Sequence, residues 1–142
     1  MPGGVRMDRD EILLPLIGGI YDCALNPDTW NVILPRIGAF VGGSAGGLFA
    51  HHASRKSGNV FYQFGTDPNF RKVYLEKYIT MDPMFGTYFV LDVGEVFSTS
   101  TVMSHAEFLQ SRFYKECIRP QGWIDNVVVY LDRTPEGHAG FA

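Results

Sequence analysis

Three pairs of Asn or Asp followed by proline divide the chain: Asn26-Pro27, Asp67-Pro68 and Asp82-Pro83. An Asn or Asp side chain accepts a hydrogen bond from a free N–H of the first helical turn. Proline suits the first helical position because it has no N–H to leave unpaired. Each pair therefore predicts that a helix begins at its proline. The fold must then consist of several short elements rather than a few long helices.

The first forty residues are typical of two helices. Apolar side chains recur with the spacing of one helix face between residues 12 and 24, and again between residues 30 and 40. Pro15 is tolerated only in a first helical turn, so the first helix is expected to begin late. Pro35 predicts a kink in the second helix, and Gly42-Gly43 predicts its end. The two helices are expected to pack as an antiparallel pair.

The remainder of the chain combines strands with further helices. Four stretches have the composition of strands: residues 44–52, 59–64, 123–131 and 138–142. The first two are expected to form a hairpin, and residues 93–97 to be extended or loop. Ser104 and Glu107 form a capping-box pattern ahead of a helix that Pro120 and Gly122 end.

This order of elements predicts an α+β fold in which helices flank an antiparallel sheet. The sheet is expected to have three or four strands. Because the chain stops just as its last strand begins, that sheet would lack an edge partner. Residues 1–142 are therefore interpreted as a single domain, truncated before the last strands of a longer polypeptide, with residues 1–8 disordered.

Composition excludes several classes of protein. The net charge is −3, and the basic residues occur singly or in pairs, which argues against nucleic-acid binding because phosphate recognition needs concentrated positive charge. The apolar run 12–21 is too short to span a bilayer. Cys23 and Cys117 are expected to be buried free thiols, which suits a cytoplasmic protein.

Aromatic side chains concentrate in one region. Ten of the twenty aromatic residues lie between Phe61 and Phe97, around the acidic dipeptide Asp82-Pro83. Apolar walls with a few polar groups are typical of small-molecule pockets, but large aromatic residues also fill ordinary cores. The sequence leaves both interpretations open.

No motif of a known catalytic chemistry is present in the sequence. Gly-x-Gly-x-x-Gly, the P-loop, Gly-x-Ser-x-Gly and His-Glu-x-x-His are all absent. His51 and His52 would point to opposite faces of a strand, so both cannot bind one metal there. Nothing brings the acidic residues of this region together as an acid–base pair: Asp82, Asp92, Glu95 and Asp125. We therefore expect no enzyme, no metal and no cofactor.

Asp82 has two possible roles. As a residue that precedes proline at a helix start, it is explained by capping alone. Its carboxylate has a second oxygen, which could also accept a hydrogen bond from a ligand N–H.

The stretch from Phe70 to Pro83, followed by Pro120-Gln121-Gly122-Trp123, resembles the N-terminal sensory domain of LuxR-type bacterial transcription regulators. In the autoinducer-binding branch, a Trp and a Tyr bind the ligand's carbonyls and an Asp accepts from its amide N–H. By this resemblance Phe70 stands at the Trp, Tyr74 at the Tyr and Asp82 at the Asp. Phe70 has no N–H donor, and Asn126 stands where that branch has Gly, so no acyl-homoserine lactone is assigned. The opening, from Leu16 to Trp30, resembles LuxR-type regulators with a PAS/GAF-like sensor.

The resemblance implies a ligand-sensing domain of PAS/GAF-like fold. The predicted ligand-binding residues are aromatic except for one acid: Phe70, Tyr74, Tyr78, Asp82, Phe85, Tyr88 and Trp123. It also implies a small, partly apolar ligand, a homodimer, and DNA binding only through a C-terminal helix-turn-helix that this chain does not contain. Two alternatives are a structural dimerisation module with a filled core and a small enzyme that uses the aromatic pocket. Trp30 is a candidate dimer contact if it faces solvent.

Overall fold

A computed structural model of the chain describes residues 8–52, 55, 57–87 and 90–142. These residues form two compact units, one of residues 8–46 with 62–65, and one of residues 47–61 with 66–142. Disorder was expected for residues 1–8, and residues 1–7 lie outside the described part of the chain. Asp8 is described, and it directly precedes the first helix.

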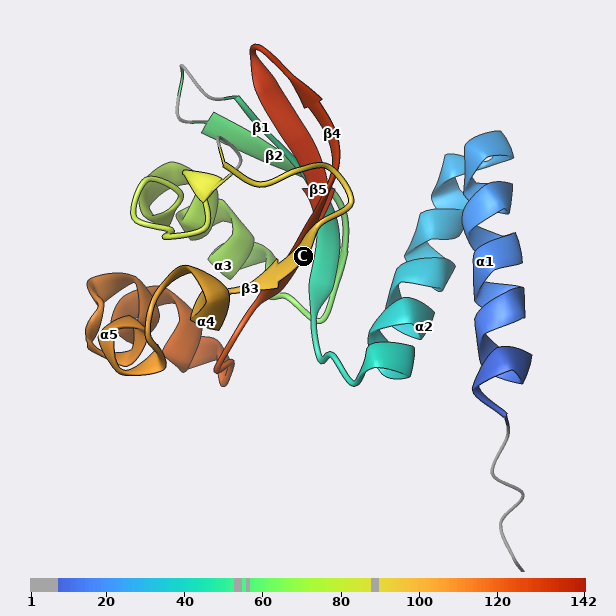
Figure 1. Cartoon of the computed structure of the whole chain (residues 1–142), viewed down its shortest axis with the longest axis horizontal. Helices are drawn as coiled ribbons and strands as arrows, with labels where there is room; N and C mark the ends of the chain where they lie inside the picture. Colours follow the sequence, from blue (N-terminus) through green and yellow to red (C-terminus); the bar gives the residue numbers. More distant parts are fainter. Residues whose placement is uncertain (1–7, 53–54, 56, 88–89) are drawn as a thin grey trace, which may run out of the picture. The chain divides into compact units, whose positions relative to one another are not determined.

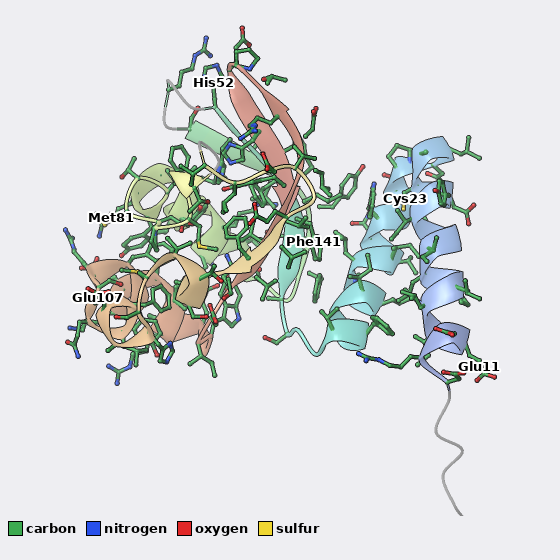
Figure 2. The ribbon with its side chains drawn as sticks, in the orientation of Figure 1. Glu11, Cys23, His52, Met81, Glu107 and Phe141 are labelled. Atoms are coloured by element: carbon green, nitrogen blue, oxygen red, sulfur yellow. The ribbon has the colours of Figure 1, made fainter. Side chains whose placement is uncertain are left out.

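The first unit contains a pair of antiparallel helices, α1 (Arg9–Leu25) and α2 (Trp30–Val41), joined by the 3-10 turn η1 (Pro27–Thr29). The two helices lie side by side (Figure 1). Figure 2 shows Cys23 between them. The buried side chains of the pair come from both helices: Leu16, Cys23, Ile33 and Leu34. The predicted helical pair is therefore confirmed, and Gly42 ends α2 in the left-handed conformation with φ 78°.

The expected late start of the first helix is wrong. The helix begins at Arg9, so Pro15 lies inside it rather than in its first turn. The start is held by local hydrogen bonds, because the Asp8 N–H donates to Glu11 Oε2 at 3.3 Å and the Glu11 N–H donates to the Asp8 carbonyl at 3.0 Å. Asn26 makes no side-chain capping hydrogen bond, although Pro27 does occupy a first helical position.

The second unit is built on a five-stranded antiparallel sheet. Its strands lie in the order β2-β1-β5-β4-β3, which places the last strand at the centre of the sheet. The strand bounds are Gly46–His52 for β1, Ser57–Phe64 for β2, Val96–Ser98 for β3, Val127–Thr134 for β4 and Gly137–Phe141 for β5. The α+β class is confirmed. The sheet exceeds the expected three or four strands because the short segment β3 pairs with β4.

Short helices cover one face of this sheet. Figure 1 shows α3, α4 and α5 on the same side of it. Their bounds are Pro68–Val73 for α3, Thr99–Val102 for α4 and His105–Gln110 for α5. Two π-helical turns, η2 (Tyr74–Tyr78) and η4 (Tyr114–Ile118), and the 3-10 turn η5 (Arg119–Gln121) complete the layer. The helix expected to run on from Ser104 is thus interrupted at Ser111, and residues 83–86 form turns instead of the expected helix.

The core of the second unit consists of two clusters of buried side chains. One lies among the helical turns and contains Tyr78, Phe108, Phe113, Cys117 and Ile118. The other joins the sheet to the loop after η2 and contains Met84, Phe97, Val128 and Tyr130. Both predicted free thiols are confirmed as buried and unpaired.

Capping of α3 provides a first stability test. Asp67 Oδ1 accepts a hydrogen bond from the Asn69 N–H at 2.7 Å. Asp67→Ala leaves this N–H without its side-chain partner, so the free energy of unfolding is expected to fall by about 1 kcal/mol. Asp67→Asn keeps an acceptor and is expected to remain within a few tenths of a kcal/mol of the wild type. Urea unfolding followed by circular dichroism measures both, and an equal loss in the two variants contradicts the capping role.

Candidate functional site

A hydrogen-bonded pair, Tyr74 and Asp82, lies between the two clusters of the second unit. Tyr74 Oη donates to Asp82 Oδ2 at 2.8 Å, and the Met84 N–H donates to Asp82 Oδ1 at 2.8 Å. Tyr74 is positioned by η2, whose i to i+5 hydrogen bond runs from the Ile79 N–H to the Tyr74 carbonyl at 2.8 Å. Single π-helical turns occur frequently at functional sites. Both oxygens of Asp82 therefore have partners within the protein.

Burial controls the protonation of this pair. Burial raises the pKa of Asp82, and the hydrogen bonds from the Met84 N–H and the Tyr74 hydroxyl oppose that rise. Burial, reinforced by the Asp82 carboxylate, raises the pKa of Tyr74 well above its usual value. Tyr74 therefore keeps its proton and acts as the donor to Asp82.

Met84 connects this pair to the sheet. Its carbonyl accepts a hydrogen bond from Thr87 Oγ1 at 2.6 Å, and Tyr130 Oη lies 2.6 Å from the same Thr87 oxygen. Tyr130 Oη also donates to the Met84 carbonyl at 3.2 Å. Tyr130 comes from β4 and is 2% exposed. A continuous polar network thus runs from η2 through the loop after Asp82 to the middle of the sheet.

Two histidines of the sheet lie beside this network and contact it through their rings. His51 of β1 and His138 of β5 are register partners, and their ring centroids lie 5.0 Å apart. The Tyr130 ring lies 4.7 Å from His138, and the Phe85 ring lies 5.0 Å from His51. Burial lowers the pKa of His51 to about 3, with His138 adding to the effect, and burial lowers the pKa of His138 to about 4. Both rings are neutral at pH 7.

His51 Nδ1 is a buried polar atom without a hydrogen-bond partner among the described residues. Such atoms are uncommon in folded proteins, and an interior water or a ligand group often satisfies them. A neutral imidazole offers one donor and one acceptor. His51 is therefore a candidate polar contact for an interior water or a small molecule.

The predicted site residues separate into groups. Tyr74 and Trp123 pack against the cluster that contains Tyr78. The Tyr78 hydroxyl donates to Glu116 Oε2 at 3.0 Å, so it is occupied at the edge of that cluster. Phe85 instead contacts the histidines.

Two other predicted residues are less closely tied to this site. Phe70 is half-buried on α3. Tyr88 lies outside the described residues. Tyr74 and Asp82 are thus two predicted site residues that share a hydrogen bond.

Sequence reasoning missed Thr87 and Tyr130 as parts of this network, and His51 and His138 as its ring contacts. The sequence offered a weak signal for Tyr130, a polar hydroxyl within a β-branched strand. For the histidines, the signal was that neighbouring residues of a strand point to opposite faces of the sheet. This was considered only as an argument about metal binding. Their proximity depends on the pairing of β1 with β5, which local patterns do not determine.

Cys117 is close to Asp82 but is not a nucleophile. Burial, followed by the Asp82 carboxylate, raises the pKa of its thiol to about 11. Reactive cysteines require a lowered pKa, because the thiolate is the reactive form. The described residues also contain no group of three or more His, Cys, Asp or Glu side chains arranged to hold a metal ion.

A groove of about 450 Å³ lies at the ends of β1, β2, β4 and β5. Its lining combines apolar surface with polar side chains, among them Asn59, Asp132, Arg133 and Glu136, and it includes His51 and His138. None of the predicted ligand-binding residues lines it. Figure 2 labels His52, which lines the groove, at one end of the sheet, and Met81 on the helical side. The groove is open rather than enclosed, and ligand pockets are typically enclosed, so the Tyr74–Asp82 region remains the stronger candidate.

Comparison with known proteins connects this fold to a sensor domain. No family model matches the chain, and no curated protein matches it. Among solved structures, the chain is similar to the crystal structure of the ligand-binding domain (LBD) of VqsR from Pseudomonas aeruginosa, a LuxR-type regulator. The TM-score is 0.73 and the sequence identity is 15%, over 91% of this chain and 77% of that chain. The chain therefore shares the α+β fold of that domain. In the described part of the chain, no helix has the length and hydropathy needed to cross a membrane.

Proposed function

We propose that this chain is the small-molecule-sensing domain of a LuxR-type transcription regulator. The observation that carries the proposal is the Tyr74–Asp82 hydrogen bond, at 2.8 Å. It joins the two residues that match the ligand-binding motif of this family, and it lies in a fold similar to the VqsR LBD. The proposal gives the site no catalytic role, which agrees with the raised pKa of Cys117.

The proposed ligand lies between the helical layer and the sheet. Asp82 accepts a hydrogen bond from a ligand N–H with lone pairs that Tyr74 and Met84 leave available, since a carboxylate has about four acceptor sites. His51 supplies a second, neutral polar contact. The remaining proposed contacts are apolar or aromatic: Phe70, Tyr78, Phe85, Tyr88 and Trp123. These groups favour a small, partly apolar molecule with an amide-like N–H.

Binding acts by changing the balance between two arrangements of the regulator. A ligand shifts such an equilibrium only by its differential affinity for the two states. We propose that the domain works in the cytoplasm as a homodimer. DNA is contacted through a separate helix-turn-helix domain of the regulator.

Native mass spectrometry of the purified chain tests the proposal, both as isolated and after incubation with a panel of small amides that carry apolar chains. The expected result is one small molecule per chain, released on denaturation. Tyr74→Phe is expected to lower its occupancy, whereas Tyr62→Phe, the same change on β2, is expected to preserve it. A folded chain that stays unliganded in both experiments contradicts the proposal.

A structural dimerisation module is the second candidate. The close packing of Tyr78, Phe108 and Phe113 in one cluster favours it, because filled cores need no ligand. This candidate predicts that a folded dimer forms with no bound molecule under any of these conditions.

A further inference from the structure

Helix α1 is apolar on two opposite faces. One face packs against α2 through Leu16 and Cys23, and Ile33 of α2 lies so close to Gly19 that a Cβ there would be 2.2 Å from its Cδ1. On the opposite face, Leu14 is 67% exposed, Tyr21 75% and Leu25 90%. Gly18 lies between them with open space around it. We call these four residues, Leu14, Gly18, Tyr21 and Leu25, the α1 stripe. The apolar face of a helix is normally buried against a partner, so a second apolar face is typical of a further contact.

We propose that the α1 stripe packs antiparallel against the α1 stripe of a second copy of this chain. The proposed function includes a homodimer, and this inference names its contact surface. It rests on that dimer and not on ligand sensing. A closed two-fold contact uses the same patch on both partners, so the patch must be complementary to itself.

The spacing of the stripe provides this self-complementarity. Its positions are separated by four, three and four residues, the spacing of a helix–helix contact. The order reads the same in both directions. In an antiparallel pair with the two-fold axis between Gly19 and Ile20, Leu14 of one copy faces Leu25 of the other. Tyr21 then faces Gly18, and the open space at the glycine accepts the tyrosine ring.

The charges of α1 disfavour a parallel pair and one other occupant. Asp10 and Glu11 lie in its first turn, and its last turn has no basic residue. A parallel pair would bring Asp10 and Glu11 of one copy beside the same residues of the other, whereas an antiparallel pair separates these like residues and aligns the helix dipoles in opposite directions. A membrane surface is disfavoured because helices that bind anionic lipids are rich in Lys and Arg on their polar face. Arg9 is the only basic residue of α1.

The size of the contact determines its strength. A helix of 17 residues is about 25 Å long, so two of them bury less than the roughly 800 Å² per partner of standard interfaces. The half-exposed flanks of the stripe, such as Ile17, add apolar area. The dimer is therefore expected to be reversible, with a dissociation constant in the micromolar range of about 1–100 μM. Trp30, the contact considered from sequence, is half-buried and lies outside the stripe.

Sedimentation of the chain over a wide range of concentrations tests the inference, with circular dichroism as the check on folding. The wild type is expected to shift from monomer to dimer. Tyr21→Glu and Gly18→Arg are expected to weaken the dimer at least about tenfold, the second without loss of fold, because Gly18 has open space and arginine is a good helix former. The control Val32→Glu places the same new charge at a residue of α2 that is 60% exposed, and is expected to leave dimerisation unchanged.

Two results overturn the inference: a wild type that stays monomeric at the highest concentration, or stripe variants that dimerise as strongly as the Val32→Glu control. Failure of ligand sensing has a different signature. A Tyr21→Glu monomer that retains a bound small molecule supports both proposals, and a dimer that never holds one overturns only the sensing function.

Discussion

The free energy of unfolding is expected to fall steeply as the pH is lowered from about 6.5 to 5, because His51 and His138 are held neutral. Burial lowers their pKa values from 6.5 to about 3 and about 4. In this pH window the unfolded chain binds protons at both imidazoles and the folded chain does not. Stability is therefore fully present above the unfolded pKa and is lost as the pH falls below it. Each proton contributes about 1.4 kcal/mol per pH unit, so the pair gives up to about 2.7 kcal/mol per unit.

Urea unfolding at a series of pH values measures this slope. His51→Phe keeps a ring between Phe49 and Phe85, whose centroids lie 4.7 and 5.0 Å from His51, and is expected to halve the slope. Phe49→Leu is the matched control, since it disturbs the same packing but leaves both imidazoles in place. It is expected to lower stability and preserve the slope. The folded pKa of Asp82 is raised, so its titration changes the free energy of unfolding with pH in the opposite direction. The difference in slope between the wild type and His51→Phe therefore isolates the contribution of the histidines. Equal slopes in the wild type and His51→Phe would mean that the buried imidazole of His51 does not cause the pH dependence of stability.

Local chemistry made part of the fold predictable. The caps at Asp67 and Ser104 were correct because a cap depends on residues within one helical turn. The strand β3 was left open between strand and loop because its three residues are stabilised by pairing with β4, far along the chain. Pro15 misled the prediction, since the bonds between Asp8 and Glu11 hold an earlier helix start than the proline alone favours.

The same difference between local and long-range contacts applies to the candidate site. Tyr74 and Asp82 are eight residues apart, and a helical turn followed by a tight turn is sufficient to bring them together. Thr87 and Tyr130 are forty-three residues apart, and their contact requires the sheet to be assembled first. The π-helical turn at Tyr74 has no sequence signature of its own, yet it determines the direction of this side chain. The sequence could therefore identify the acid and its nearest aromatic partner, but not the polar network behind them.

Replacing Asp82 is expected to have a comparably large effect, and the choice of replacement separates structure from ligand binding. Asp82→Ala leaves the Tyr74 hydroxyl and the Met84 N–H without their acceptor. Each buried polar group left unpaired costs about 1–3 kcal/mol, so the free energy of unfolding is expected to fall by about 2–5 kcal/mol. Asp82→Asn retains one oxygen for the Met84 N–H, and its amide can donate to the Tyr74 hydroxyl. Because it also removes a buried charge, its stability is expected to stay within about 1 kcal/mol of the wild type.

Ligand affinity is expected to respond differently from stability. A neutral amide cannot provide the charge-assisted hydrogen bond that a carboxylate offers to a ligand N–H, a bond worth about 1.5–3 kcal/mol. Asp82→Asn is therefore expected to bind the co-purified molecule about tenfold or more weakly while remaining folded. Denaturant unfolding and titration of the stripped protein with the recovered molecule measure the two effects separately. If Asn leaves both unchanged, the carboxylate has no special role, and Asp82 acts only through the two hydrogen bonds that hold Tyr74 and Met84 in place.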